Sequence, residues 1–229
     1  MNDPTPEPKV LADPRERIVD ALFALLSDKS WADIGLYEIA LRAGVSLSEL
    51  RILFPSKGAI LSGFVRKIDL EVLKVDATDL AGEPVRERIF DVLMRRFEAL
   101  APYRDALRKV RDGLVTDPLG AAAMNQVAVS SMQWMLAAAS VPESGPFGTA
   151  RAQALVLLTA RVFRTFLNDP DEDLARTMKA LDEELRKAER WAERADDLGR
   201  LAAPFRSALD RVLGRSTRPK PDDDVASAA

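Results

Sequence analysis

The sequence predicts an all-α protein, and three observations support this class. Apolar residues recur at helical spacing through most of the 229 residues. Prolines stand where helices would start, at Pro14, Pro84, Pro102 and Pro118. No segment between these prolines shows the alternation of apolar and polar residues that a half-buried strand requires.

The first predicted helix begins at Pro14. Asp13 can accept hydrogen bonds from its free amides, and Glu16 places a carboxylate in its first turn. Apolar residues then follow at helical spacing up to Leu26. These features together predict a long amphipathic helix.

Two short helices separated by a tight turn come next. The first spans residues 36–43 and ends at Gly44, where a left-handed backbone costs little. The second runs over 47–54, because Ser46-Leu47-Ser48-Glu49 has the pattern of a capping box and Pro55 cannot continue a helix. This spacing is typical of a helix-turn-helix, although a helical corner without DNA-binding function has the same pattern.

Ser56 can cap a longer helix after the second short one. From the first helix to this one, the chain resembles the N-terminal domain of the TetR family of bacterial repressors over about residues 13–75. The resemblance is carried by Ile39-Ala40, Ala43-Gly44-Val45-Ser46, Leu50 and Phe54-Pro55-Ser56-Lys57. It implies an all-α TetR-like fold, with a helix-turn-helix domain over 13–57 and a larger helical domain for ligand binding and dimerisation over 58–197.

The resemblance also implies that operator DNA is a partner. The residues that would contact it are Tyr37, Arg42, Ser46, Leu47, Ser48, Arg51 and Lys57. Family members commonly have Thr before the first short helix, Arg within it, Lys or a small polar residue after the capping Ser, and Tyr or His in the recognition helix. This chain departs from that pattern with Gly35, Tyr37, Leu47, Arg51 and Leu53.

The charge of the predicted DNA-binding domain is unusual. Residues 13–57 contain six basic side chains (Arg15, Arg17, Lys29, Arg42, Arg51, Lys57) and seven acidic ones (Asp13, Glu16, Asp20, Asp28, Asp33, Glu38, Glu49). Neutralisation of phosphates supplies most non-specific affinity for DNA. DNA binding would therefore need a local basic patch, which Arg42, Arg51 and Lys57 could form; the alternative is that these three are ordinary solvated charges.

The C-terminal part is predicted to contain a central helix and a ligand pocket. The run 121–136 approaches the length of a membrane span, but its Asn, Gln and Ser residues are costly in hydrocarbon and favour a helix packed inside the domain. The family resemblance implies an apolar effector site there. The alternative is a plain close-packed core. The predicted lining is Met94, Phe97, Met124, Met132, Trp134, Met135, Phe163 and Phe166.

A pair of late helices, Thr149 to Leu167 and Asp171 to about Ala195, is predicted to form the homodimer interface. In the family this chain resembles, such a pair usually meets its copy as a four-helix bundle. The residues assigned to this interface are Leu155, Leu158, Val162, Leu174, Met178 and Leu181, which could instead be buried within one subunit. We expect a disordered arm over 1–12, an amphipathic helix over 198–213 and a disordered tail over 214–229.

Composition argues against an enzyme. Cysteine and histidine are both absent, so thiol nucleophiles, disulfides, imidazole bases and the usual zinc ligands are excluded. Glycines are scattered singly and form no phosphate-binding loop. We expect no cofactor and no metal, and the polar N-terminus without an apolar core predicts a cytoplasmic protein.

Two hypotheses from different classes remain. The first is a transcriptional regulator that binds DNA through the helix-turn-helix and responds to a small apolar effector. The second is a relative without DNA binding that carries a lipid or isoprenoid, as the TetR-fold accessory protein of ubiquinone biosynthesis does, and docks on a membrane surface or an enzyme. The acidic balance, Leu47, Leu53 and the helix 198–213 favour the second, whereas the retained turn motifs favour the first, which we adopt.

Overall fold

Four capped helices form the N-terminal part of the computed structural model, which describes residues 13–75, 82–142, 144 and 147–191. Helix α1 (Pro14–Asp28) is capped by Asp13, and α2 (Leu36–Ala43) ends at Gly44 with φ 64°. Helix α3 (Leu47–Leu53) carries the predicted capping box, in which Ser46 and Glu49 each accept a hydrogen bond from the other's backbone amide. Helix α4 (Lys57–Leu73) is capped by Ser56. The predicted helix starts and caps are confirmed, and α3 ends one residue before the predicted end at 54.

The rest of the chain is also helical. The elements are α5 (Val85–Leu100), the 3₁₀ turn η2 (Ala101–Tyr103), α6 (Arg104–Val115), α7 (Pro118–Ala138) and α8 (Gly148–Leu167). Residues 175–185 form a further helix in the same compact unit, which ends at Leu185, and residues 186–191 of a second unit are helical. All regular secondary structure in the described residues is α-helix or 3₁₀ helix, which confirms the predicted all-α class.

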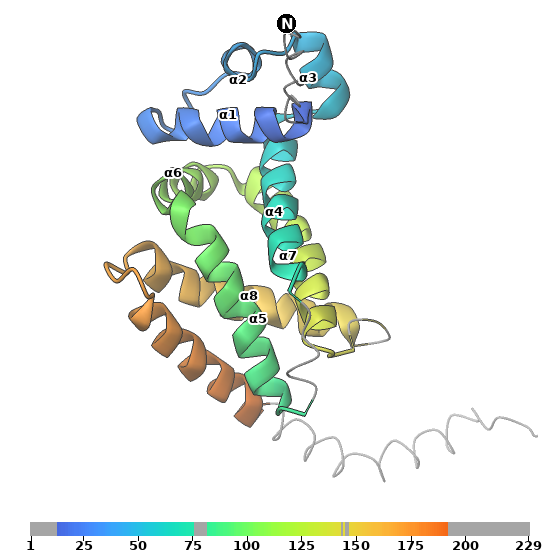
Figure 1. The fold of residues 1–229 in the computed structure, drawn as a ribbon, viewed down its shortest axis with the longest axis vertical. Helices are drawn as coiled ribbons and strands as arrows, with labels where there is room; N and C mark the ends of the chain where they lie inside the picture. Colours follow the sequence, from blue (N-terminus) through green and yellow to red (C-terminus); the bar gives the residue numbers. More distant parts are fainter. Residues whose placement is uncertain (1–12, 76–81, 143, 145–146, 192–229) are drawn as a thin grey trace, which may run out of the picture. The chain divides into compact units, whose positions relative to one another are not determined.

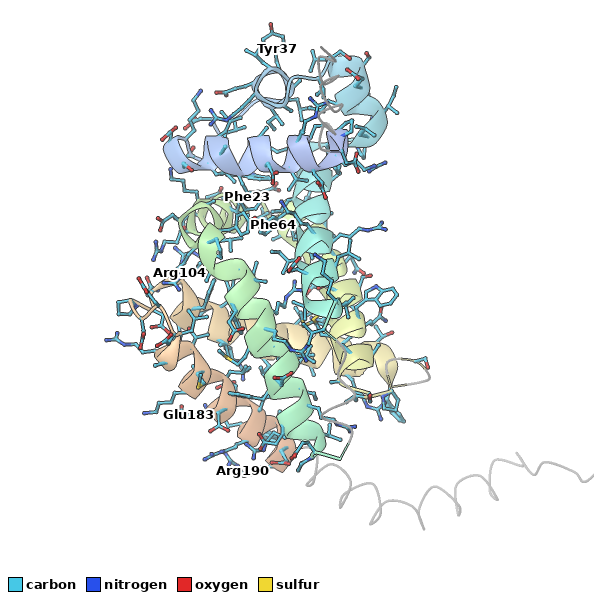
Figure 2. All side chains as sticks on the ribbon, in the orientation of Figure 1. Phe23, Tyr37, Phe64, Arg104, Glu183 and Arg190 are labelled. Carbon is cyan, nitrogen blue, oxygen red and sulfur yellow. The ribbon has the colours of Figure 1, made fainter. Side chains whose placement is uncertain are left out.

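Helix α4 joins the helix-turn-helix to the larger helical part. Helices α1, α2 and α3 gather at one end of α4, while α5 and α7 pack along the rest of it (Figure 1). Phe64 of α4 stacks on Phe23 of α1 with ring centroids 3.8 Å apart, and Tyr103 of η2 meets both rings edge-on. Figure 2 shows Phe23 and Phe64 near each other where α1 meets α4. This aromatic cluster fixes α1 against both α4 and η2.

A second set of contacts connects the end of α1 and the loop after it to α6. Trp31 lies so close to Gly113 that a Cβ atom on this glycine would be 2.5 Å from Cδ1 of the indole. Lys109 of α6 donates a hydrogen bond to the backbone oxygen of Ser27, at 2.7 Å. The helix-turn-helix and the larger domain therefore share one compact unit rather than hanging on a linker.

The helix that follows α8 begins later than the sequence predicted. Asp169 is almost fully buried and accepts hydrogen bonds from the amide and the hydroxyl of Thr177. Burial alone would raise the pKa of Asp169, but these bonds outweigh it and hold the pKa below the usual range. Leu174 takes a left-handed backbone (φ 56°), so regular helix starts at residue 175 and not at Asp171.

Several predicted segments fall outside the described residues. They are the arm over 1–12, the end of the larger domain at 192–197, the amphipathic helix over 198–213 and the tail over 214–229. Among the helices that are described, none combines the length and the apolar character needed to cross a bilayer.

The contact between Gly113 and Trp31 gives a test of how the two parts are joined. Gly113→Ala adds a methyl group closer to Trp31 than carbon atoms normally pack, with the Cβ of the indole side chain only 2.7 Å away. We expect a loss of about 1–3 kcal/mol in the free energy of unfolding, although alanine is the better helix former. Urea denaturation followed by circular dichroism measures this change.

Gly58→Ala in α4 is the matched control. Its added methyl group meets only the hydroxyl oxygen of Ser56, at 3.8 Å, so helix propensity should leave stability equal or slightly raised. Equal destabilisation by both substitutions would contradict the proposed close packing of Trp31 on α6.

Candidate DNA-binding surface and ligand groove

The outer faces of α2 and α3 hold most of the predicted DNA-contacting residues. Ile39, Ala40 and Ala43 of α2 and Leu50 of α3 are buried and hold the two helices on the core. The opposite side is exposed and presents Tyr37, Arg42, Ser46, Leu47, Ser48 and Arg51. Figure 2 shows Tyr37 at the outer edge of α2, on the side away from α1. The buried residues of α2 and α3 thus orient an exposed face that could bind a partner.

Arg42 and Arg51 are the exposed cations of this face. Arg42 lies in the last turn of α2, and Arg51 lies in the last turn of α3. A guanidinium nitrogen of Arg51 is 3.4 Å from the backbone oxygen of Pro55, which is long for a hydrogen bond. Arg51 can therefore exchange this contact for one with a partner at little cost.

Lys57 does not face outward as the sequence analysis expected. Its ammonium group donates to the backbone oxygens of Trp31 and Ile34, the latter at 3.0 Å, and lies 4.6 Å from the centroid of the Trp31 ring. Burial lowers the pKa of Lys57, although nearby Asp33 opposes this effect. The physical reason for the correction is that two carbonyl groups of the loop before α2 need a donor, and Lys57 supplies it.

The remaining cations of the helix-turn-helix are also engaged within the domain. Arg17 donates to the backbone oxygen of Ala43 at 3.1 Å, and Arg15 to that of Leu53 at 3.2 Å. Both bonds satisfy carbonyls at the C-terminal ends of the short helices, where positive charge is favourable. Lys29 pairs with Glu38 at 2.5 Å. Most of the positive charge counted in the sequence therefore stabilises the fold.

Large apolar side chains are exposed on the same two helices. Leu41 is 70% exposed and Ile52 is 80% exposed, and Leu36, Tyr37 and Leu47 are also exposed. The sequence predicted outward positions for Tyr37, Leu47 and Ile52 but an inward one for Leu36, and it gave no position for Leu41. Leu41 follows the buried Ala40 directly, so it cannot share the buried face of α2, whereas Leu36 lies at the start of that face and is 39% exposed.

Most of the predicted pocket residues lie in the close-packed core. Met94, Phe97, Met132, Met135 and Phe166 are at most 6% exposed, and Met124 and Phe163 are half-buried. Phe97 and Phe163 each contact the Phe166 ring, with centroids 5.2 and 5.7 Å apart. These residues pack against one another, as expected for a close-packed core, which was the alternative to a ligand pocket.

A groove of about 520 Å³ lies between α4 and α7, and Trp134 is the predicted pocket residue that lines it. Its lining residues are Ser62, Val65, Arg66, Asp69, Leu70, Leu73, Val127, Ser130, Ser131 and Trp134. Asp69 forms a buried ion pair with Arg96 of α5 and accepts a hydrogen bond from the hydroxyl of Ser131 at 2.8 Å. The groove thus combines an apolar lining with a charged and hydroxylated one.

The predicted dimer-interface residues are mostly buried within one subunit. Leu155, Leu158, Val162, Leu174 and Leu181 are at most 6% exposed in the single chain, so they leave little surface for contact with a second copy. Met178 is 43% exposed. The reason is that the most apolar face of each helix packs into the core of its own subunit. The outer side of α8 exposes Leu157 instead.

Comparison with solved structures identifies the architecture. A TetR transcriptional regulator from Nitrosomonas europaea matches with a TM-score of 0.62 at 24% sequence identity, over 77% of this chain and 98% of that one. The fold is that of the TetR-family regulators. A TetR-family regulator from Streptomyces coelicolor matches with a TM-score of 0.52 at 17% identity, over 91% of this chain and 99% of that one.

A third TetR regulator of this fold comes from a Rhodococcus species. It has a TM-score of 0.50 at 23% identity and covers 75% of this chain and 96% of its own. No protein-family model and no curated protein sequence matches the chain. The likeness to the TetR regulators therefore rests on three-dimensional structure together with the motifs quoted above.

The inward position of Lys57 predicts a structural role. Lys57→Met keeps an aliphatic stem beside Trp31 but leaves the backbone oxygens of Trp31 and Ile34 without their donor. We expect the free energy of unfolding to fall by about 1–3 kcal/mol. Arg42→Met removes an exposed cation and should change stability by no more than about 0.5 kcal/mol. Thermal and urea unfolding of both variants would decide, and equal effects would refute the structural role.

Proposed function

We propose that this protein is a TetR-like transcriptional regulator that binds operator DNA and responds to a small ligand with an apolar part. The observation that carries the proposal is the helix-turn-helix itself. Helix α3 is fixed at its start by a complete capping box, held from below by Leu50, and exposed along the face that contains Ser48 and Arg51. Such a helix can enter the major groove without rearrangement.

The chemistry of the exposed face suggests how DNA would be read. Arg51 has the planar fork of donors that suits guanine O6 and N7. Leu47 offers an apolar surface for a thymine methyl group, and Ser48 can donate to a phosphate or a base. Tyr37 and Arg42 on α2 lie where phosphate contacts would orient the domain. The reading surface thus relies on a few direct contacts more than on a strong positive field.

We also propose that the protein acts as a homodimer through the outer side of α8 and the helix that follows it. Leu157 and Met178 are exposed on these helices, and Ala154 and Ala160 beside Leu157 are small enough to allow close approach of a second copy. A two-fold symmetric dimer would place two copies of α3 at the spacing of operator half-sites.

Helix α4 is the proposed route from ligand to DNA. Its first residue, Lys57, holds the loop before α2, and Phe64 in its middle stacks on α1. Further along α4, Arg66, Asp69 and Leu70 line the groove shared with α7. A ligand that moved α4 relative to α7 would shift the support of the helix-turn-helix and change the separation of the two α3 helices.

The proposal predicts sequence-preferring DNA binding that depends on Arg51. The purified full chain should shift a fragment of its own promoter region at near-physiological salt, in preference to random DNA of equal length. Arg51→Ala should weaken this binding about fivefold or more, because a good bidentate contact contributes about 1–3 kcal/mol of discrimination. An electrophoretic mobility shift titration measures both effects.

Arg151→Ala is the matched control for this experiment. Arg151 is likewise exposed and likewise donates to a proline carbonyl, that of Pro142, but lies on α8. Its removal should leave the shift unchanged. If the wild-type chain binds only at very low salt and without preference over random DNA, the regulator proposal is wrong.

A second candidate function is a lipid or isoprenoid carrier that does not bind DNA. The specific observation in its favour is the exposed apolar character of α2 and α3, where Leu41 and Ile52 accompany Leu36, Tyr37 and Leu47. Such a surface suits a protein or membrane partner better than a phosphate backbone. If the DNA-binding test fails, native mass spectrometry of the purified chain for a bound isoprenoid or fatty acid tests this candidate.

A further inference from the structure

The groove between α4 and α7 has an apolar side that is open to solvent. Leu70 of α4 is 54% exposed, and Trp134 of α7 is 59% exposed. Leu73 and Val127 also line the groove. Leaving a tryptophan and a leucine this exposed costs hydrophobic free energy unless something covers them.

The other side of the groove carries an unneutralised positive charge. Arg66 lines it and is exposed, and none of the ion pairs between described residues includes its guanidinium group. Arg66 lies four residues before Leu70 on α4, so the cation and the apolar side chain share one helix face. Ser62 and Ser130 also line the groove; the hydroxyl of Ser62 donates to the backbone oxygen of Gly58, so Ser130 is the neutral donor on this side.

The buried floor of the groove does not cancel this charge. Asp69 is buried, and its carboxylate is paired with the buried guanidinium of Arg96 and accepts a hydrogen bond from Ser131. The ion pair is therefore balanced within itself. Asp69, Arg96 and Ser131 come from α4, α5 and α7, so their contacts also hold the walls of the groove in place. Arg66 therefore remains as the exposed surplus charge of the groove lining.

We propose that this groove binds a small amphiphile with an acidic head group. The carboxylate or phosphate of the ligand meets Arg66, with the hydroxyl of Ser130 as a further donor, and the apolar part lies between Leu70 and Trp134. A volume of about 520 Å³ is in the range of small-molecule sites. This inference names the ligand class of the proposed effector. Only the effect of the ligand on DNA binding rests on the proposed function.

The experiment uses decanoate as the probe and decanol as its uncharged counterpart, both below their aggregation concentrations and without DNA. Equilibrium dialysis against the full chain should show one decanoate per subunit. Arg66→Gln should weaken decanoate about tenfold or more and leave decanol nearly unchanged, because it removes only the charge-assisted contact. Arg66→Lys should retain most of the decanoate affinity.

Two further variants complete the design. Trp134→Ala should weaken decanoate and decanol alike, because both use the apolar side of the groove. Arg151→Gln removes an exposed arginine on α8 and should change neither. No saturable decanoate binding, or equal affinity in the wild type and in Arg66→Gln, would overturn the proposal. A chain that binds decanoate through Arg66 but binds no operator would refute the regulator function and leave the groove standing.

Discussion

The ammonium group of Lys57 is the contact on which the helix-turn-helix depends. It supplies donors to two backbone carbonyls in the loop between α1 and α2, and it lies over the ring of Trp31. Trp31 in turn packs on Gly113 of α6. Because Lys57 is also the first residue of α4, one side chain connects the start of the long helix, the loop that positions α2, and the larger domain. Loss of this partly buried donor would leave both carbonyls without an equally good partner.

This use of lysine has an electrostatic consequence for function. Arg15, Arg17 and Lys57 satisfy carbonyl groups inside the domain, and Lys29 pairs with Glu38, so Arg42 and Arg51 are the cations left on the outer faces of α2 and α3. The same faces are unusually apolar. Any affinity for DNA must then arise from a small number of direct contacts on a rigid helix pair, and a long-range positive field contributes little.

The capped elements could be predicted from the sequence because their signals are local. Asp13, the Ser46–Glu49 box, Gly44 and Ser56 act within three or four residues of themselves, and the structure confirms each one. The direction of Lys57 could not be predicted, since it depends on carbonyls more than twenty residues away. Leu155 and Met132 show a related difficulty: an apolar stripe records that a residue is buried, but not whether the core, a ligand or a second subunit buries it. The left-handed Leu174, which delays a helix, left no local signal at all.

The regulator that we propose would meet DNA through few cationic contacts. The salt dependence of operator binding tests this account most directly. If Arg42 of each subunit in a dimer neutralises one phosphate while Arg51 contacts a base, the logarithm of the association constant should fall with the logarithm of salt concentration with a slope of about −2. A slope of about −8 or steeper would mean that the cations engaged in the fold also reach DNA, and it would contradict the account, as would the absence of measurable operator binding at any salt concentration in the series.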